Sequence, residues 1–150
     1  MCIRDSPDIG SFVHRGRRYG VIHGGVRDTS QFIWASSPEA TFRAVIAEVE
    51  AEIGAVDGIV AGHCGMAFHR MIGSHQWINT GAIGMPPHDG RPETRFVVLQ
   101  KGEVTIHRLA YDHAAARAAM DDVGLTQGYH VTLSTGVWPS EDVLPAELRR

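Results

Sequence analysis

The sequence predicts a single α/β domain, and three observations support this class. Several apolar stretches are short enough to be buried strands, one amphipathic helical stretch separates two of them, and these strands end in glycine-rich turns. With 150 residues and 43% hydrophobic content, the chain can form one sizeable core but not two. We therefore expect one domain, with its chemistry at the ends of its strands.

The first half of the chain reads as strand, helix and strand. Residues 18–22, RYGVI, form an expected strand that ends at His23. A helix is expected after Ser36-Ser37-Pro38-Glu39, with a capping serine and a proline in the first turn. Its apolar residues recur at helical spacing up to Gly54, which should end it: Phe42, Val45, Ile46, Val49 and Ile53.

Two further apolar stretches follow this helix. Residues 58–62, GIVAG, predict a second buried strand that ends at His63, and residues 76–79, QWIN, predict a third that leads into Thr80-Gly81. The strand, helix and strand order, with a helix of this length, is typical of α/β proteins.

The second half of the chain has a different texture. Residues 95–100 and 103–109 predict a β-hairpin around the turn Lys101-Gly102. Asp112 can cap an alanine-rich helix over residues 114–122, which Gly124 would end. Residues 131–135, VTLST, are expected to form an edge strand, and the rest of the tail reads as irregular.

These patterns divide the chain into three segments. Residues 1–18 show no clear period and are interpreted as a non-native or irregular segment, because the first six, MCIRDS, resemble read-through of a sequencing adaptor. Residues 19–124 carry the α/β pattern. Residues 125–150 are interpreted as a C-terminal extension.

Composition excludes several classes of function. A formal net charge of −3 offers no basic field for a phosphate backbone, so dedicated nucleic-acid binding is not expected. No apolar stretch is long enough to span a membrane, and the start lacks the pattern of a signal peptide, so we expect a cytoplasmic protein without a membrane partner. Cys2 and Cys64 are not arranged as a CxxC motif, which argues against a zinc knuckle or a disulfide framework.

Nitrogen and oxygen donors stand at three strand exits. His23, His63 and Asn79 follow the three apolar strands, next to glycines that allow sharp turns and close approach of a bound group. Such donors suit a divalent metal. A single histidine at a strand end is more often a hydrogen-bonded core residue, and the pattern alone leaves both interpretations open.

These exits also carry a resemblance to a known family. The run Gly62-His-Cys-Gly-Met-Ala-Phe68, then Ile78-Asn-Thr-Gly-Ala-Ile-Gly-Met-Pro86 and Asp89-Gly90, resembles the C-terminal half of calcineurin-like metallophosphoesterases. In that family a GHxH segment precedes an N-P-G-S-x-G turn and a hairpin. Val21-Ile-His-Gly-Gly25 is similar to the family's preceding V-x-H-G segment.

The resemblance implies part of a four-layer α/β/β/α sandwich with a β-hairpin and a C-terminal helix. It also implies divalent metal ions, two in an intact enzyme, drawn from manganese, iron and zinc. His23 and His63 correspond to metal ligands of the family, whereas the second histidine of GHxH is Gly65 here, so one donor is missing. Arg27 is the candidate substrate-binding residue, as a phosphate contact, the alternative being a solvated loop arginine.

The N-terminal motifs of the family, D-x-H, G-D-x-x-D and G-N-H-[DE], do not occur before His23. We therefore expect a fragment of a phosphatase or phosphodiesterase that uses a metal-activated water, inactive by itself, and we assign no catalytic residue. Its expected partners are a phosphorylated small molecule, a nucleotide or a phosphoprotein. The alternative is a non-catalytic binding module of the same fold that lacks a complete metal site.

One neighbouring residue is not expected to take part in catalysis. Cys64 follows His63 directly, and strand alternation should turn its thiol away from the histidine ring. Trp77 is likewise expected to have no role in substrate binding and to be a core residue.

Overall fold

The computed structural model describes residues 8–150, so the interpretation of MCIRDS lies outside the described residues. Five strands form one mixed sheet in the order β1-β2-β3-β5-β4, in which β2, β3 and β5 run parallel and β1 and β4 pair antiparallel at the edges. The bounds of these strands are β1 Gly10–His14, β2 Arg17–Val21, β3 Gly58–Ala61, β4 Ala67–Ile72 and β5 His75–Thr80.

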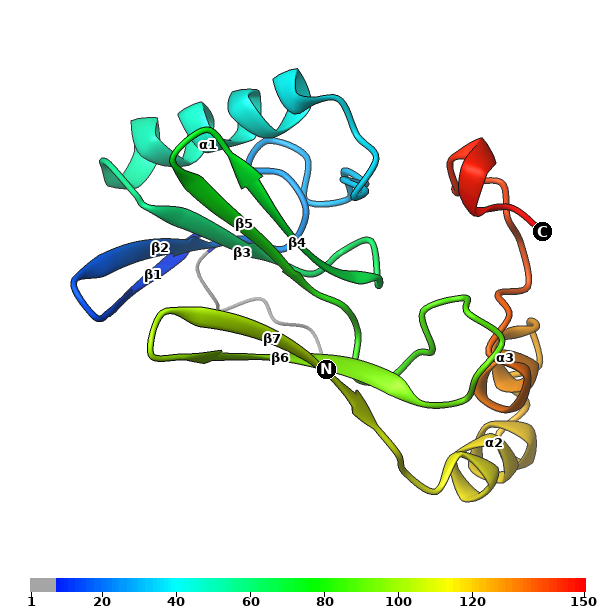
Figure 1. Cartoon of the computed structure of the whole chain (residues 1–150). Coiled ribbons are helices and arrows are strands. Elements are labelled where there is room, and N and C mark those ends of the chain that lie inside the picture. The colour runs from blue at the N-terminus through cyan, green and yellow to red at the C-terminus, as the bar shows by residue number, and fades with distance from the viewer. Residues whose placement is uncertain (1–7) are drawn as a thin grey trace.

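Helix α1, Glu39–Ile53, covers one face of this sheet (Figure 1). Phe42, Val45, Ile46 and Val49 are buried as the helical spacing predicted, and the Phe42 ring meets Trp77 of β5 edge to face. Trp77 is fully buried, which confirms its place in the core. The expected serine cap is wrong, because the capping position is Pro38, whose side chain has no acceptor, and Ser37 Oγ accepts from the Trp34 N–H instead.

Residues 10–14 and 17–18 lie in strands where we expected irregular chain. Residues 10–14 pair with β2 in a hairpin whose turn is Arg15-Gly16, both with positive φ (53° and 78°). A two-residue turn with this backbone matches the twist of paired strands. An arginine in the left-handed region is uncommon, so the residue types at this turn did not indicate it.

A second hairpin joins β6, Thr94–Gln100, to β7, Glu103–Leu109, as predicted. Its turn Lys101-Gly102 again has two positive φ angles, 54° and 89°. In Figure 1 the hairpin lies across the face of the five-stranded sheet opposite α1, and the Gly102 N–H donates to His14 Nε2 (3.2 Å). The helix and the two sheets form successive layers, which is the α/β architecture expected.

Helices α2, His113–Asp122, and α3, Tyr129–Thr135, pack against each other beyond the end of the second hairpin (Figure 1). Asp112 caps α2 by accepting from the Ala115 N–H, as predicted. The expected edge strand over residues 131–135 is wrong. β-branched residues favour strands, but here tertiary contacts favour the helix. Thr132 is fully buried, and the Thr135 hydroxyl donates to the Val131 carbonyl (3.1 Å), so this hydroxyl has its hydrogen-bond partner within the helix.

A short 3₁₀ turn, η1, Ala146–Leu148, lies near the end of the chain. Among residues 8–150 no helix combines the length and the apolar character needed to cross a membrane.

Candidate metal centre

Two loops at the carboxyl ends of β2 and β3 carry His23 and His63 and are joined by their backbones. The Ile22 N–H donates to the Val60 carbonyl, and the N–H groups of Gly62 and His63 both donate to the His23 carbonyl (3.0 and 2.9 Å). Because the strands are parallel and adjacent, their exits emerge at the same edge of the sheet. The two histidines, 40 residues apart in sequence, are therefore brought together.

The two imidazole rings meet through one nitrogen each. His63 Nδ1 lies 2.9 Å from His23 Nε2, with the ring planes inclined by 68°. His23 is exposed and His63 is half-buried. The other ring nitrogen of His63, Nε2, is buried and makes no hydrogen bond with residues 8–150.

The surroundings of His63 favour the neutral form of its imidazole. Burial lowers the pKa of His63 below its ordinary value, and the positive charge of a protonated His23 lowers it further. The backbone of Ser30 and the Asp28 carboxylate oppose this shift. A neutral imidazole has the free lone pair that a metal ligand needs.

Gly24 lets the β2 exit turn tightly enough to place His23. A Cβ at this position would lie 2.5 Å from the Thr29 carbonyl oxygen and 2.7 Å from that of Gln31. Real Cβ atoms do not approach backbone oxygens so closely. Glycine is therefore required here by close contact of the backbone with the loop that follows, residues 29–31.

A hollow of about 380 Å³ opens beside the histidine pair and is lined by the exits of β2, β3 and β5. The third strand contributes Thr80 to it and not Asn79, which we expected as a donor. Asn79 is buried, and its Oδ1 accepts from the Gly81 N–H (3.0 Å). Strand alternation from the core residue Trp77 places Asn79 on the core side and Thr80 on the other, so the sequence held the signal that would have found Thr80.

Arg27 is not among the residues that line this hollow. Its guanidinium lies 3.4 Å from the Glu48 carboxylate on α1, and its side chain is 85% exposed. An exposed pair of this kind contributes about 0–1 kcal/mol, so the arginine is held only weakly in this position.

Other candidate donors do not join the histidine pair. His69 lies exposed on β4, and His75, the first residue of β5, has its Nε2 3.4 Å from Glu50 Oε1. Within residues 8–150, no cluster of three or more histidine, cysteine, aspartate or glutamate side chains could hold a metal ion. The described chain therefore supplies two neighbouring imidazole nitrogens, and not a complete coordination shell.

The thiol of Cys64 is not a nucleophile in this setting. It is 1% exposed, and burial raises its pKa to about 11, so it stays protonated at neutral pH.

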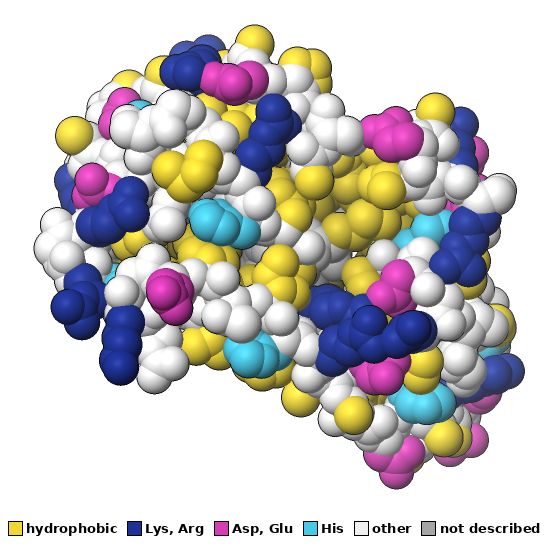
Figure 2. Space-filling view, viewed as in Figure 1, with side chains coloured by type: hydrophobic (Ala, Val, Ile, Leu, Met, Phe, Trp, Pro, Cys, Tyr) yellow, Lys and Arg dark blue, Asp and Glu magenta, His cyan; other side chains and the backbone are white. Residues whose placement is uncertain are grey.

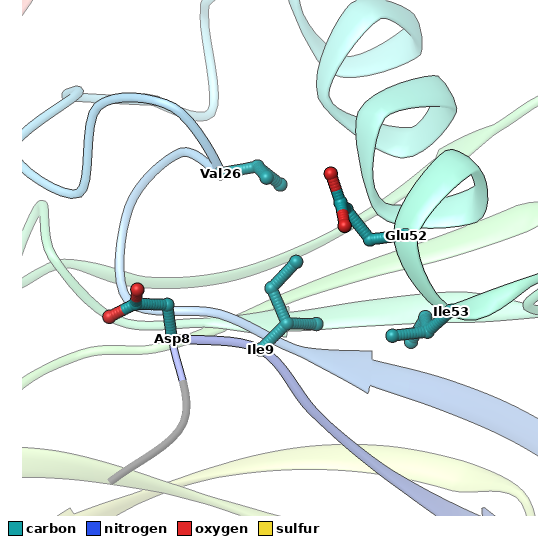
Figure 3. Close-up of a pocket in the computed structure, with 5 residues that line it drawn as sticks. All are labelled: Asp8, Ile9, Val26, Glu52 and Ile53. Carbon is teal, nitrogen blue, oxygen red and sulfur yellow. The ribbon is translucent and has the colours of Figure 1, made fainter. Parts of the chain in front are cut away.

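A second hollow of about 380 Å³ has a different character (Figure 3). It lies between Ile9, Val26 and the end of α1, and Figure 3 shows Ile9 and Ile53 pointing toward each other across it. Its ionisable groups are the carboxylates of Asp8 and Glu52. Two carboxylates repel a phosphate group, so this hollow does not suit an anionic substrate.

Comparison with solved structures places this arrangement among known folds. A metallophosphoesterase from Sphaerobacter thermophilus superimposes with a TM-score of 0.66 over 90% of the chain, at 21% identity. The chain has the calcineurin-like metallophosphoesterase fold. A hypothetical protein from Pyrococcus horikoshii, PH1004, superimposes with a TM-score of 0.73 over 89% of the chain, at 15% identity.

The chain spans only part of the length of these two proteins, 61% of the Sphaerobacter structure and 52% of the Pyrococcus structure. Comparison with protein-family models gave no match, and comparison with curated protein sequences gave none either. The fold agrees with the resemblance that the strand exits suggested.

Proposed function

We propose that this chain is part of a metal-dependent phosphoesterase, in which His23 and His63 bind one divalent metal ion and phosphate esters are hydrolysed by an activated water. The observation that supports it most strongly is the contact between His63 Nδ1 and His23 Nε2 at the edge where parallel strands end. The metallophosphoesterase fold agrees with this reaction class.

The spacing of the two ring nitrogens fits a shared metal. Two nitrogens bound to one ion at about 2.0–2.1 Å lie roughly 2.9–3.4 Å apart, for ligand angles between about 90° and 109°. The observed separation is 2.9 Å. The lowered pKa of His63 also fits, because protonation of the imidazole would block metal binding.

The residues have separate tasks in this proposal. His23 and His63 hold the metal, and the hydrogen bonds from Gly62 and His63 to the His23 carbonyl keep their exits in register. Arg27 can leave its weak pair with Glu48 and donate to a phosphate oxygen. A bound divalent metal would supply a water with a lowered pKa and positive charge next to the phosphoryl oxygens. The substrate is a phosphorylated small molecule, a nucleotide or a phosphoprotein.

The second candidate function is a non-catalytic binding module of the same fold. The observation that favours it is the small number of donors. Gly65 stands where the family has a second histidine, and no group of three ligands occurs in residues 8–150. A site with two protein donors should hold a metal weakly, because stable sites usually have at least three.

Metal binding by the purified chain tests the pair directly. Isothermal titration with Zn²⁺, and broadening of histidine ring resonances by Mn²⁺, should both report a weak site. His23→Ala and His63→Ala should each weaken binding by more than about tenfold, since even a change behind a ligand costs about 10–100-fold. His69→Ala is the matched control, because His69 is an exposed histidine outside the hollow. Equal affinity in all three variants would refute the assignment.

Hydrolysis separates the two candidate functions. With added Mn²⁺, an aryl phosphate should remain intact with this chain alone and be hydrolysed by a longer form that carries the family's N-terminal motifs. Absence of hydrolysis in that longer form, together with retained metal binding, would favour the binding module. Activity of the chain alone that disappears in His63→Ala would show that the donors present are sufficient.

A further inference from the structure

A second cavity, with mainly apolar walls, is also lined by His63. It has a volume of about 210 Å³, and we call it the aromatic pocket. The polar groups at its rim are Tyr129 and Ser140. Its apolar walls and the histidine come from four distant parts of the chain: Phe32, His63, Cys64, Met85, Trp138 and Val143. Figure 2 shows hydrophobic side chains gathered in the hollow between the sheets and the C-terminal segment.

The Trp138 wall of the aromatic pocket is fixed by hydrogen bonds. The indole Nε1–H donates to the Pro86 carbonyl (2.7 Å), and the Trp138 backbone N–H donates to His88 Nδ1 (2.9 Å). His88, itself buried, donates through Nε2 to Glu141 (2.9 Å). A wall held in this way needs little reorganisation when a ligand enters.

The opposite wall is also preset for an uncharged ring. The Phe32 ring centroid lies 4.6 Å from that of His63 and 5.3 Å from that of Trp34. The Cys64 side chain, only 1% exposed, is a small apolar neighbour in the same lining. Aromatic walls with no charged group favour a flat apolar ligand over a polar one.

The volume limits the size of that ligand. A cavity of about 150 Å³ holds a benzene molecule, so the aromatic pocket has room for one six-membered ring with a small substituent. The hydroxyl groups of Tyr129 and Ser140 can meet a polar substituent at the rim. A nucleoside, with its sugar and base, is too large to be enclosed.

His63 is the residue that the two cavities share. It lines both the aromatic pocket and the larger hollow at the histidine pair. A group attached to a ring in the aromatic pocket can therefore lie next to His63, whose imidazole contacts that of His23.

We propose that the aromatic pocket receives the ring of an aryl phosphate whose phosphate group lies at the His23–His63 pair. This inference rests on the proposed function, because it assigns the phosphate to the same pair, and it narrows the substrate to monoesters of single-ring aromatic alcohols. Specificity then comes from the C-terminal segment, since Tyr129, Trp138 and Val143 all lie in residues 125–150.

Binding of two probes tests the proposal. Phenyl phosphate and ethyl phosphate carry the same charge and differ in the ring, so titration of each into the ¹⁵N-labelled chain, in the presence of Zn²⁺, measures the contribution of the pocket. Phenyl phosphate should bind at least about tenfold more tightly. It should also shift the indole N–H resonance of Trp138, which ethyl phosphate should leave in place.

A pair of matched variants locates the effect. Val143→Trp puts a large ring at the mouth of the aromatic pocket and should reduce the phenyl-to-ethyl preference to about twofold or less. Val123→Trp is the control, because Val123 is likewise exposed (70%, against 47% for Val143) but lies at the end of α2 outside the pocket. Both substitutions are at surface positions, so both variants should fold, and thermal unfolding checks this.

The possible failures are distinguishable. Equal affinity for phenyl and ethyl phosphate, or a preference that survives Val143→Trp, overturns the aromatic pocket. If His23→Ala and His63→Ala both bind Zn²⁺ as tightly as the native chain, the proposed metal pair is overturned. That titration contains no organic ligand, so its result does not depend on the aromatic pocket. Phenol, which has no phosphate, should still shift the Trp138 resonance in the native chain and not in Val143→Trp, and absence of that shift also overturns the pocket.

Discussion

Restoring the missing histidine by Gly65→His should not restore a metal ligand. The backbone at Gly65 has φ 71°, and a Cβ built there would lie 3.4 Å from the Trp138 ring and 3.5 Å from the end of Met85. Both residues line the aromatic pocket. The new imidazole would therefore point toward that pocket. The Zn²⁺ affinity should stay within about twofold of the native value. An imidazole that coordinated the metal would instead change the affinity by at least about tenfold, or about 1.4 kcal/mol.

The cost of this substitution follows from the same geometry. The left-handed conformation costs a residue with a Cβ about 1–2 kcal/mol, and the contacts of the Cβ are ordinary ones, so they add little. The free energy of unfolding should therefore fall by about 1–2 kcal/mol. In a chain of 150 residues this corresponds to a loss of about 2–8 °C in Tm.

Three chains measured side by side by urea denaturation and Zn²⁺ titration complete the experiment. Gly65→Ala has the same backbone strain without an imidazole, so it should lose about the same stability as Gly65→His. Gly62→Ala, whose φ is not positive and whose nearest neighbour is Thr80 Oγ1 at 3.5 Å, should lose none. An increase of tenfold or more in Zn²⁺ affinity, in Gly65→His alone, would refute the geometric argument.

The remaining predictions concern His63, His88 and Cys64. In the metal-free chain, the ring proton resonances of His63 should report a pKa below the ordinary value of 6.5. His23→Ala should raise this pKa only in part, because burial, the larger cause of the shift, is unchanged in the variant. Since the unfolded chain then binds the proton first, the free energy of unfolding should decrease as the pH falls below about 6.5. His88→Ala should cost about 1–3 kcal/mol in urea denaturation, because the buried Trp138 N–H loses its acceptor. Iodoacetamide at pH 8 should modify Cys64 only after unfolding, as seen by peptide mass spectrometry, because its thiol is buried and has a pKa of about 11.

Each of these has an outcome that contradicts it. A His63 pKa at or above 6.5 would show that the ring is not desolvated. If His88→Ala is as stable as the native chain, the Trp138 wall does not depend on that hydrogen bond. Alkylation of Cys64 at the rate of a free thiol in the folded chain would mean that the thiol reaches solvent.

Local patterns predicted those parts of the fold that local physics decides. Helix α1 follows from apolar residues at helical spacing and from Gly54, and the β6–β7 hairpin follows from two strands around Lys101-Gly102. The N-terminal hairpin was missed because its turn uses an arginine at positive φ. Helix α3 was mistaken for a strand because its β-branched residues are held by burial and by side-chain hydrogen bonds that propensity does not include.

Strand pattern and turn chemistry are properties of neighbouring residues, so they were enough to put His23 and His63 at the exits of two buried strands, next to glycines. Three features depend instead on how distant segments pack: the 2.9 Å between the two histidine nitrogens, the presence of Thr80 and not Asn79 in the hollow, and the pocket that Phe32 and Trp138 line. These contacts join segments up to about a hundred residues apart. Their distances depend on strand register and packing, which no short stretch of sequence encodes.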